Sequence, residues 1–259
     1  HVRRAGEDLR AGAVVLPAGA RLAAHHLAVA AGAGVAVVDV RRRPRVALLL
    51  TGDEIVPVVA DPSPGQIWDI AGHALPALLR ASGAEVVTRV LVPDDRRRTE
   101  AAVASALEGA DLVVSVGGVS AGVHDHVGPA IEASGARTLG AGARLRPGHP
   151  IRRAVGAGTP LLALPGNPVS ALVCLAVVGR PLLGVTDPWS ERALAADYES
   201  PTPRTDLIRC TEAPAGLVPA ARQASHDISG LATATHIAVV PEGRGRVVAG
   251  EALAALPLP

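Results

Sequence analysis

The sequence is poor in several residue types, and each shortage excludes a class of protein. It has no lysine, methionine or phenylalanine, and its 259 residues include only two cysteines. Cys174 and Cys210 are far apart and lack the spacing of metal ligands, so we expect neither a disulfide framework nor a cysteine-rich metal centre. This cysteine usage is typical of a protein in a reducing cytoplasm.

Excess charge and long apolar runs are missing as well. The formal net charge is +1 and 19% of the residues are charged. No general field therefore draws the protein to nucleic acid or to an anionic membrane, and any anion must be bound by a local site. The apolar runs are interrupted before they reach about 18 residues, the length of a membrane span. The chain begins at His1 without a signal-peptide pattern, and we expect a piece of a longer cytoplasmic protein.

What is present divides the chain into three regions. Residues 1–40 have the pattern of the end of a domain and predict one short helix within 22–31. Residues 41–186 alternate short apolar runs with longer amphipathic stretches, which is typical of βαβ units. We therefore expect a three-layer α/β domain with a doubly wound, mostly parallel sheet. Residues 187–259 contain short β-like runs between turns, which predicts a small β domain.

The expected elements of the middle region follow from this alternation. Strands are expected at 46–50, 86–92, 112–116 and 161–164. Helices are expected at 66–81, 99–108, 127–133 and 168–183. In the last region the expected strands are 207–210, 237–240 and 246–248.

Small and acidic residues follow each expected strand of the middle region. The segments are Thr51-Gly52-Asp53-Glu54, Pro93-Asp94-Asp95, residues 117–125 and residues 165–170. Ligands bind beyond the carboxyl ends of the strands in an open parallel sheet, so these segments should meet on one ligand-binding rim.

The loop Gly117-Gly118-Val119-Ser120 is a candidate phosphate cradle. Glycine has no side chain, so the backbone N–H groups of such a loop can approach an anion closely. The candidate contacts here are Ser115, Gly117, Gly118 and Ser120. A tight turn between a strand and a helix would use the same glycine pair, and the pair by itself leaves both interpretations open.

A second candidate segment opens an apolar helix after the last expected strand. Free N–H groups and the positive end of the helix dipole favour an anion at such a position. The candidate contacts are Pro165, Gly166, Asn167, Pro168 and Ser170. An ordinary N-cap with proline in the first turn is the alternative.

Carboxylates on the expected rim indicate a cation. They would repel a phosphate unless a divalent ion lay between them, and Mg²⁺ takes one or two protein carboxylates together with water and phosphate oxygens. We expect Glu54, Asp94 and Asp125 as its ligands. For each of them, solvation or turn capping is the alternative. His124 and His126 have no third ligand at matching spacing, so we expect no zinc site.

These motifs, in this order, resemble those of the molybdopterin molybdenumtransferases, which are the bacterial MoeA proteins and the corresponding domain of gephyrin. The resemblance rests on the segments named above, on Arg146-Pro147-Gly148, and on the run from Leu164 to Ala171. Gly6-Glu7-Asp8 and residues 225–241 fit the same family, so the resemblance covers essentially the whole chain.

The resemblance implies a Mg²⁺-dependent reaction. Adenylylated molybdopterin is cleaved, AMP leaves, and molybdate is transferred to the dithiolene. Residues carried over by motif as functional acidic positions are Asp8, Glu54, Asp94 and Asp125. Arg146 matches a basic position expected to face oxyanions, and His149 lies close to it. The resemblance also implies a homodimer in the full-length protein and a molybdopterin adenylyltransferase as partner.

The chain departs from the family at four positions. His149 and Gly142 stand where many members have lysine, Ala71 where they have asparagine, and Val116 where they have a hydroxyl residue. Each change removes a polar contact. A second hypothesis is therefore a degenerate paralogue that binds a pterin or nucleotide without catalysis. A third is a molybdopterin adenylyltransferase, which shares the central domain only.

Overall fold

The computed structural model describes residues 1–120, 122, 124–185 and 189–259. Ala121 and Val123 of the glycine loop, and the expected domain boundary between residues 186 and 187, lie outside the described residues. His1–Arg42 and Arg43–Pro259 form two compact units.

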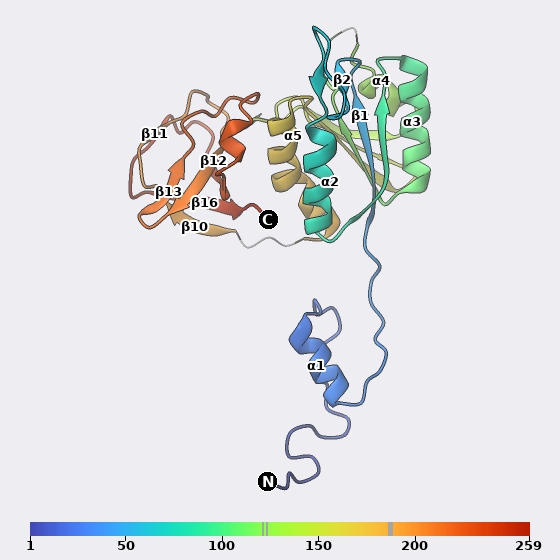
Figure 1. Cartoon of the computed structure of the whole chain (residues 1–259), viewed down its shortest axis with the longest axis vertical. Coiled ribbons are helices and arrows are strands. Elements are labelled where there is room, and N and C mark those ends of the chain that lie inside the picture. Colours follow the sequence, from blue (N-terminus) through green and yellow to red (C-terminus); the bar gives the residue numbers. More distant parts are fainter. Residues whose placement is uncertain (121, 123, 186–188) are drawn as a thin grey trace. The chain divides into compact units, whose positions relative to one another are not determined.

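The first unit contains the helix α1, Ala24–Gly32 (Figure 1). It confirms the expectation of a short helix in this region. The first turn of α1 is closed by His26, whose Nδ1 accepts a hydrogen bond from the Ala23 N–H at 3.0 Å. This side chain satisfies one of the backbone donors that a helix N-terminus leaves free.

The second unit is built on a six-stranded sheet with the order β4-β1-β5-β9-β8-β6. The strands are β1 (Arg45–Thr51), β4 (Glu85–Val92), β5 (Leu112–Val116), β6 (Arg137–Ala141), β8 (Arg152–Gly156) and β9 (Thr159–Leu164). β4, β1, β5 and β9 are parallel, and β8 is antiparallel to both of its neighbours. The strands expected in the middle region are confirmed, and so is a mostly parallel sheet.

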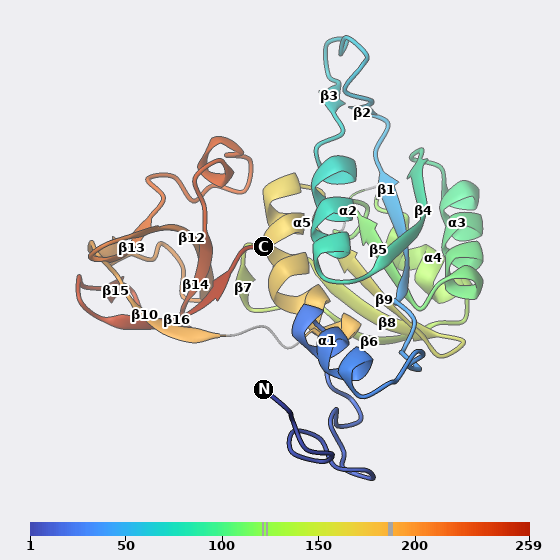
Figure 2. The ribbon, with the colours of Figure 1, turned by 60° about the horizontal axis from the view of Figure 1, so that its bottom comes forward.

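Helices cover both faces of this sheet and complete three layers (Figure 2). They are α2 (Ala71–Ala81) and α5 (Pro168–Cys174) on one face, and α3 (Arg96–Gly109) and α4 (Val127–Ala133) on the other. Successive residues of β1 face opposite layers: Leu48 shares a buried cluster with Leu75 of α2, and Leu49 shares one with Val103 of α3. No helix in the described part of the chain is long and apolar enough to cross a membrane.

Two helix boundaries differ from the expectation. The helix expected from residue 66 begins at Ala71, because β3 (Ile67–Trp68) pairs in parallel with β2 (Ile55–Val56). Asp69 then starts α2, since its carboxylate accepts from the Gly72 N–H at 2.6 Å. The last expected helix keeps α-helical geometry only to Cys174; a π-helical turn (Leu175–Gly179) and a 3-10 turn (Arg180–Leu183) follow.

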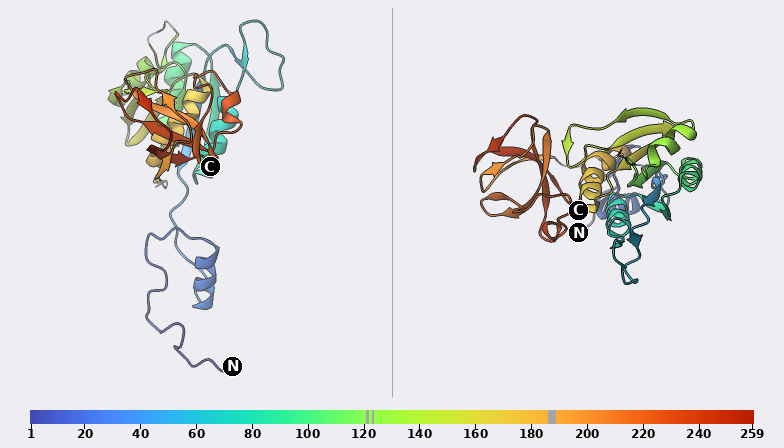
Figure 3. Two further views of the ribbon diagram at one scale, coloured as in Figure 1. Left: turned by 90° about the vertical axis from the view of Figure 1, so that its left-hand side faces the viewer. Right: turned by 90° about the horizontal axis from the view of Figure 1, so that it is seen from above.

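A second sheet has the order β10-β16-β14-β12-β13, with β7 paired to β12. Its strands β10 to β16 are coloured orange to red in Figure 3. The strands are β7 (Leu145–Arg146), β10 (Ser190–Ala193), β12 (Thr205–Ala213), β13 (Gly216–Pro219), β14 (His236–Val240) and β16 (Ala252–Pro257); β11 (Tyr198–Glu199) pairs with β15 (Arg246–Val247). Leu207 and Ile237 of this sheet belong to the same buried cluster as Val173 of α5. The second sheet therefore packs against the helical layer that contains α5.

Candidate functional site

The carboxyl ends of β1, β4, β5 and β9 surround a pocket of about 310 Å³, which we call the acidic pocket. Glu54, Asp94 and Asp125 line it from three separate loops. Its remaining lining includes Gly117, Gly118, Val119, Ser120 and the segment Pro165-Gly166-Asn167. The structure thus brings together the strand-end segments that the sequence places on one rim.

Close backbone approaches fix the floor of the acidic pocket. The Gly117 N–H donates to the Leu164 carbonyl at 3.1 Å, and the Thr51 hydroxyl donates to the Val116 carbonyl at 3.2 Å. Gly117 has a φ of +88°, and a Cβ at this position would lie 2.5 Å from Thr51 Oγ1. Glycine is therefore required here by the crossing of the strand ends.

The carboxylates of the acidic pocket are held by backbone N–H groups. Asp125 accepts from the Gly122 N–H at 2.6 Å. Asp94 accepts from the Asp53 N–H at 3.4 Å, and Asp53 accepts from the Asp94 N–H at 3.1 Å. No ion pair to an arginine or histidine neutralises Glu54, Asp94 or Asp125 within the part of the chain that is described. Their negative charge is consequently available to a cation.

The chemistry of these donors fits Mg²⁺. It is a hard cation that prefers oxygen ligands and keeps several waters or phosphate oxygens in its shell. No three His, Cys, Asp or Glu side chains among the described residues are grouped so that they could hold a metal ion by themselves. A site with one or two of these carboxylates, completed by water and substrate oxygens, suits Mg²⁺. Metal binding by Glu54, Asp94 and Asp125 stays a prediction.

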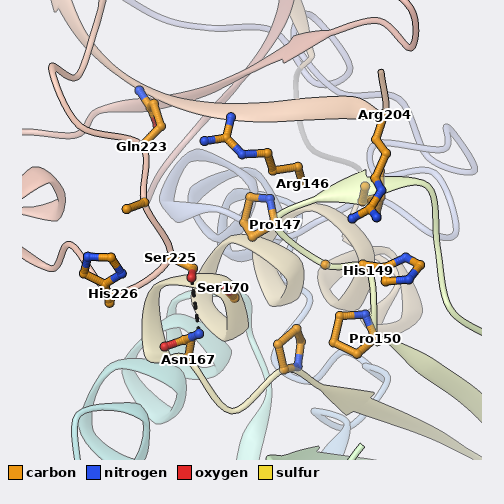
Figure 4. A pocket seen from close by; sticks show the side chains of 14 residues that line it. Arg146, Pro147, His149, Pro150, Asn167, Ser170, Arg204, Gln223, Ser225 and His226 are labelled. Atoms are coloured by element: carbon orange, nitrogen blue, oxygen red, sulfur yellow. Dashed lines mark hydrogen bonds between the residues drawn. The ribbon is translucent and has the colours of Figure 1, made fainter. Parts of the chain in front are cut away.

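A second pocket, of about 450 Å³, lies between the two sheets, and we call it the basic pocket (Figure 4). Arg146, His149, Arg204 and His226 line it, and none of its lining residues among those described is a carboxylate. The Ser170 side chain lies at its base, as Figure 4 shows. Basic groups from β7 and from the loops after β7, before β12 and after β13 therefore surround one cavity.

The two pockets adjoin. Pro150, Pro165 and Asn167 line both of them. The Asn167 side-chain amide donates to Ser225 Oγ at 3.2 Å, which ties the loop after β9 to the loop after β13 (Figure 4). We call the two adjoining pockets together the groove; it has an acidic end at the strand termini and a basic end beside the second sheet.

Part of the positive charge in the basic pocket is already shared. Arg146 Nη1 donates to Asp206 Oδ2 at 2.8 Å, and Tyr198 and Ser200 donate to the same oxygen at 2.8 Å and 3.0 Å. Burial of Tyr198, reinforced by its hydrogen bond to Asp206, raises the pKa of its hydroxyl to about 12. The Asp206 side chain is 2% exposed, so it holds Arg146 from within the protein. Arg146 lines the pocket as expected, with its charge already paired.

A buried arginine shapes the wall opposite β7. Arg209 donates to the carbonyls of Asp227 and Arg222, both at 2.8 Å, and its backbone N–H donates to Gln223 Oε1 at 3.0 Å. Burial lowers the pKa of this guanidinium. These bonds hold the loop that presents Gln223, Ser225 and His226 to the basic pocket. Sequence patterns give no signal for them, because the acceptors are main-chain carbonyls of a loop far along the chain.

Some expected residues lie elsewhere. Ser115 is fully buried within β5, its hydroxyl has no hydrogen-bond partner among the described residues, and it lines neither pocket. Its side chain alternates with Val116, which faces the layer of α2 and α5, so it lies on the same face as Val113, beneath the layer of α3 and α4. Pro168 begins α5 behind the lining. Asp8 belongs to the first unit, and its role stays a prediction.

Of the four departures from the family pattern, three line neither pocket and one lines the basic pocket. Ala71 and Val116 are both buried in the hydrophobic core and line neither pocket. Gly142 donates its N–H to the Ile151 carbonyl at 2.8 Å. His149 alone among the four lines the basic pocket.

Known proteins are similar to this chain over its main sheet and, for some of them, over nearly its whole length. The family model described as "Probable molybdopterin binding domain" matches residues 47–184. Molybdopterin molybdenumtransferase 2 of Mycobacterium tuberculosis (strain ATCC 25618 / H37Rv) is 35% identical over 98% of this chain and 66% of its own length. A molybdopterin molybdenumtransferase of Nostoc sp. is 38% identical over 66% of this chain and 40% of its own length. This chain thus covers 66% of the length of the first relative and 40% of the length of the second.

Solved structures agree with the fold. A molybdopterin biosynthesis MoeA protein from Pyrococcus horikosii has a TM-score of 0.86 and 27% identity, covering 98% of this chain and 64% of that one. A molybdenum cofactor biosynthesis protein from Pyrococcus furiosus has a TM-score of 0.73 and 24% identity, covering 97% of this chain and 82% of that one. The similarity therefore includes the second sheet.

Proposed function

On the premise that the chain belongs to the molybdopterin-binding family, we propose that it inserts molybdate into adenylylated molybdopterin in a Mg²⁺-dependent reaction that releases AMP. The observation that carries the proposal is the acidic pocket next to the basic pocket, with three lining residues in common. The adenylylated substrate presents a phosphoanhydride, whose charge a carboxylate-held cation neutralises. Molybdate is an oxyanion, which suits arginine and histidine donors.

The groups of the groove have separate roles in this reaction. One or two of the carboxylates Glu54, Asp94 and Asp125 would hold Mg²⁺, and the ion would supply positive charge at the phosphoanhydride. The backbone N–H groups of the Gly117–Ser120 loop orient the phosphate oxygens, and Arg204, His149 and His226 orient the oxyanion. Because these groups bind and align without forming covalent bonds, their contribution is orientation and electrostatics.

The wider assignments belong to the same proposal. The chain acts in the cytoplasm on a small-molecule substrate supplied by a molybdopterin adenylyltransferase, and in its full-length form it is a homodimer. Residues 41–186 and 187–259 are its two catalytic parts, with the groove formed where they meet.

The carboxylates test the proposal. The protein is incubated with adenylylated molybdopterin, molybdate and Mg²⁺, and AMP release is measured by chromatography. Asp94→Ala and Asp125→Ala should abolish Mg²⁺-dependent release. Asp95→Ala is the matched control, because Asp95 lies next to Asp94 but caps α3 by accepting from the Arg98 N–H at 2.8 Å. It should retain turnover while losing about 1 kcal/mol of stability. Unchanged turnover in both the Asp94 and Asp125 variants would contradict the metal assignment.

A second candidate is a degenerate paralogue that binds pterin or nucleotide without catalysis. The observations that favour it are His149 in place of a lysine and the pairing of Arg146 with Asp206. In the same assay it predicts binding of AMP with no release from the adenylylated substrate. ATP-dependent adenylylation of molybdopterin would instead identify an adenylyltransferase.

A further inference from the structure

Arg152 lies behind the glycine loop and belongs to neither pocket lining. It comes from β8, the antiparallel strand of the main sheet, and its Nε donates to the Val119 carbonyl at 3.2 Å. Its guanidinium also packs on Gly128 in the first turn of α4, where a Cβ would lie 3.2 Å from Arg152 Cζ. The half-buried guanidinium therefore fills the space between the loop and α4.

This hydrogen bond fixes the direction of one peptide group. A trans peptide is planar, and its C=O and N–H point in opposite directions. The Val119 carbonyl and the Ser120 N–H belong to the same peptide. Both residues line the acidic pocket, whereas Arg152 does not. With the carbonyl held toward Arg152, the Ser120 N–H is directed to the pocket side. Within the described residues no acceptor takes that N–H.

We propose that Arg152 is a positioning residue that orients the Val119–Ser120 peptide so that the Ser120 N–H donates to phosphate-class oxygens in the acidic pocket. The inference rests on the proposed function in taking the ligand to be a phosphate ester such as AMP. The guanidinium also contributes a positive field beneath the loop. Without Arg152 the peptide is free to rotate, and its carbonyl then presents a negative dipole to the anion.

The neighbouring residue supplies a matched control. Arg153 is the next residue of β8, faces the opposite side of the sheet beside Gly140, and is exposed. Arg152→Met and Arg153→Met therefore remove the same charge from adjacent positions, and only the first removes the bond to Val119. Arg152→Lys keeps the charge and the apolar stem but lacks the Nε donor, and it serves if Arg152→Met does not fold.

Two measurements test the proposal. The first is the amide resonance of Ser120 in ¹⁵N-labelled, ligand-free protein, which should shift in Arg152→Met and remain unchanged in Arg153→Met. The second is calorimetric titration with AMP and with inorganic phosphate. Affinity should fall about tenfold in Arg152→Met, as expected for one lost hydrogen bond to a charged group, and about threefold in Arg152→Lys. It should be unchanged in Arg153→Met.

Each possible result of these measurements either supports the role of Arg152 or contradicts a stated part of the proposal. If the Ser120 resonance or the AMP affinity of Arg152→Met equals that of Arg153→Met, the positioning role is wrong. If the unmodified protein binds neither AMP nor phosphate, the anion-binding role is wrong whatever the resonance does. If AMP binds as expected but no AMP is released from adenylylated molybdopterin, the proposed function fails while the role of Arg152 in phosphate binding stands.

Discussion

The floor of the acidic pocket is main chain at the ends of the strands of one sheet, whereas the basic pocket is lined by side chains from β7 and from loops beside the second sheet. In the first, Gly117 and Thr51 approach so closely that no Cβ fits between the strand ends. In the second, Arg146, Tyr198 and Asp206 form a hydrogen-bonded network across β7, β11 and β12. The shape of a main-chain floor tolerates changes in surrounding side chains but not in its glycines. A side-chain site depends on every partner in its network, and its charge changes with each substitution.

Of the substitutions considered for the two pockets, removal of Asp206 from the basic pocket should have the largest effect on stability. Asp206→Ala leaves Arg146 without its partner and removes the acceptor of Tyr198 and Ser200, so we expect a loss of about 3 to 5 kcal/mol in the free energy of unfolding. Urea unfolding measures the loss. The control is Glu242→Ala, which breaks the exposed ion pair with Arg144 and should leave the free energy of unfolding nearly unchanged, because solvent screens an exposed pair. Equal effects of the two variants would show that the basic pocket does not depend on its buried network.

The acidic pocket should respond to the smallest substitution, a single methyl group. Gly117→Ala places a Cβ 2.5 Å from Thr51 Oγ1 at a φ of +88°, and we expect it to cost about 3 kcal/mol. Gly83→Ala is the control, because Gly83 has a φ of +82° with nothing within 4 Å of the added atom. It should cost about 1 kcal/mol, the cost of the left-handed backbone alone. Thermal unfolding of both variants tests this, and a difference near zero would mean that the close approach carries no energy.

The smallest expected effect concerns the hydroxyl of Tyr198, the chain's only tyrosine, whose ionisation absorbance reports directly. Burial and Asp206 raise its pKa from the ordinary 10.0 to about 12, so its contribution to stability is complete below pH 10 and is lost as the pH rises through 12. Asp206→Asn should lower the midpoint by roughly half a unit, because partial exposure screens the interaction. Glu199→Gln, at an exposed neighbouring carboxylate, should leave it unchanged. A midpoint near 10.0 in the unmodified protein would contradict the network.

The parallel core of the fold and the strands β12, β14 and β15 of the last region could be predicted from the sequence, whereas β6, β7 and β8 could not. Strands β1, β5 and β9 are continuous apolar runs because both of their faces are covered by helices. β6 and β8 lie at the end of the sheet, and their arginines and glycines give no apolar periodicity. β7 has only two residues, and it is a strand because β12 pairs with it, which no local pattern records.

Some residues of the candidate site could likewise be predicted from the sequence, and others could not. Glu54, Asp94 and Asp125 could be predicted to lie together because the carboxyl ends of parallel strands meet at one edge. Arg204, Gln223 and His226 could not, because their place in the basic pocket depends on how the second sheet packs against α5. Ser115 was expected as a contact of the glycine loop, but it is fully buried within β5 and lines neither pocket.

The pairing of β7 with β12 fixes the position of Arg146 in the basic pocket relative to the second sheet. Thr205 pairs with Leu145 and Asp206 with Arg146, so the residues that begin the wall of the basic pocket are a strand of the second sheet. A strand register changes only in whole residues, and a shift by one would turn Arg146 to the other face of the sheet. The hydrogen bonds between β7 and β12 therefore allow this wall of the basic pocket to shift only in steps of whole residues. Lengthening the loop before β12 would leave that width unaltered, whereas inserting one residue within β7 would remove Arg146 from the cavity.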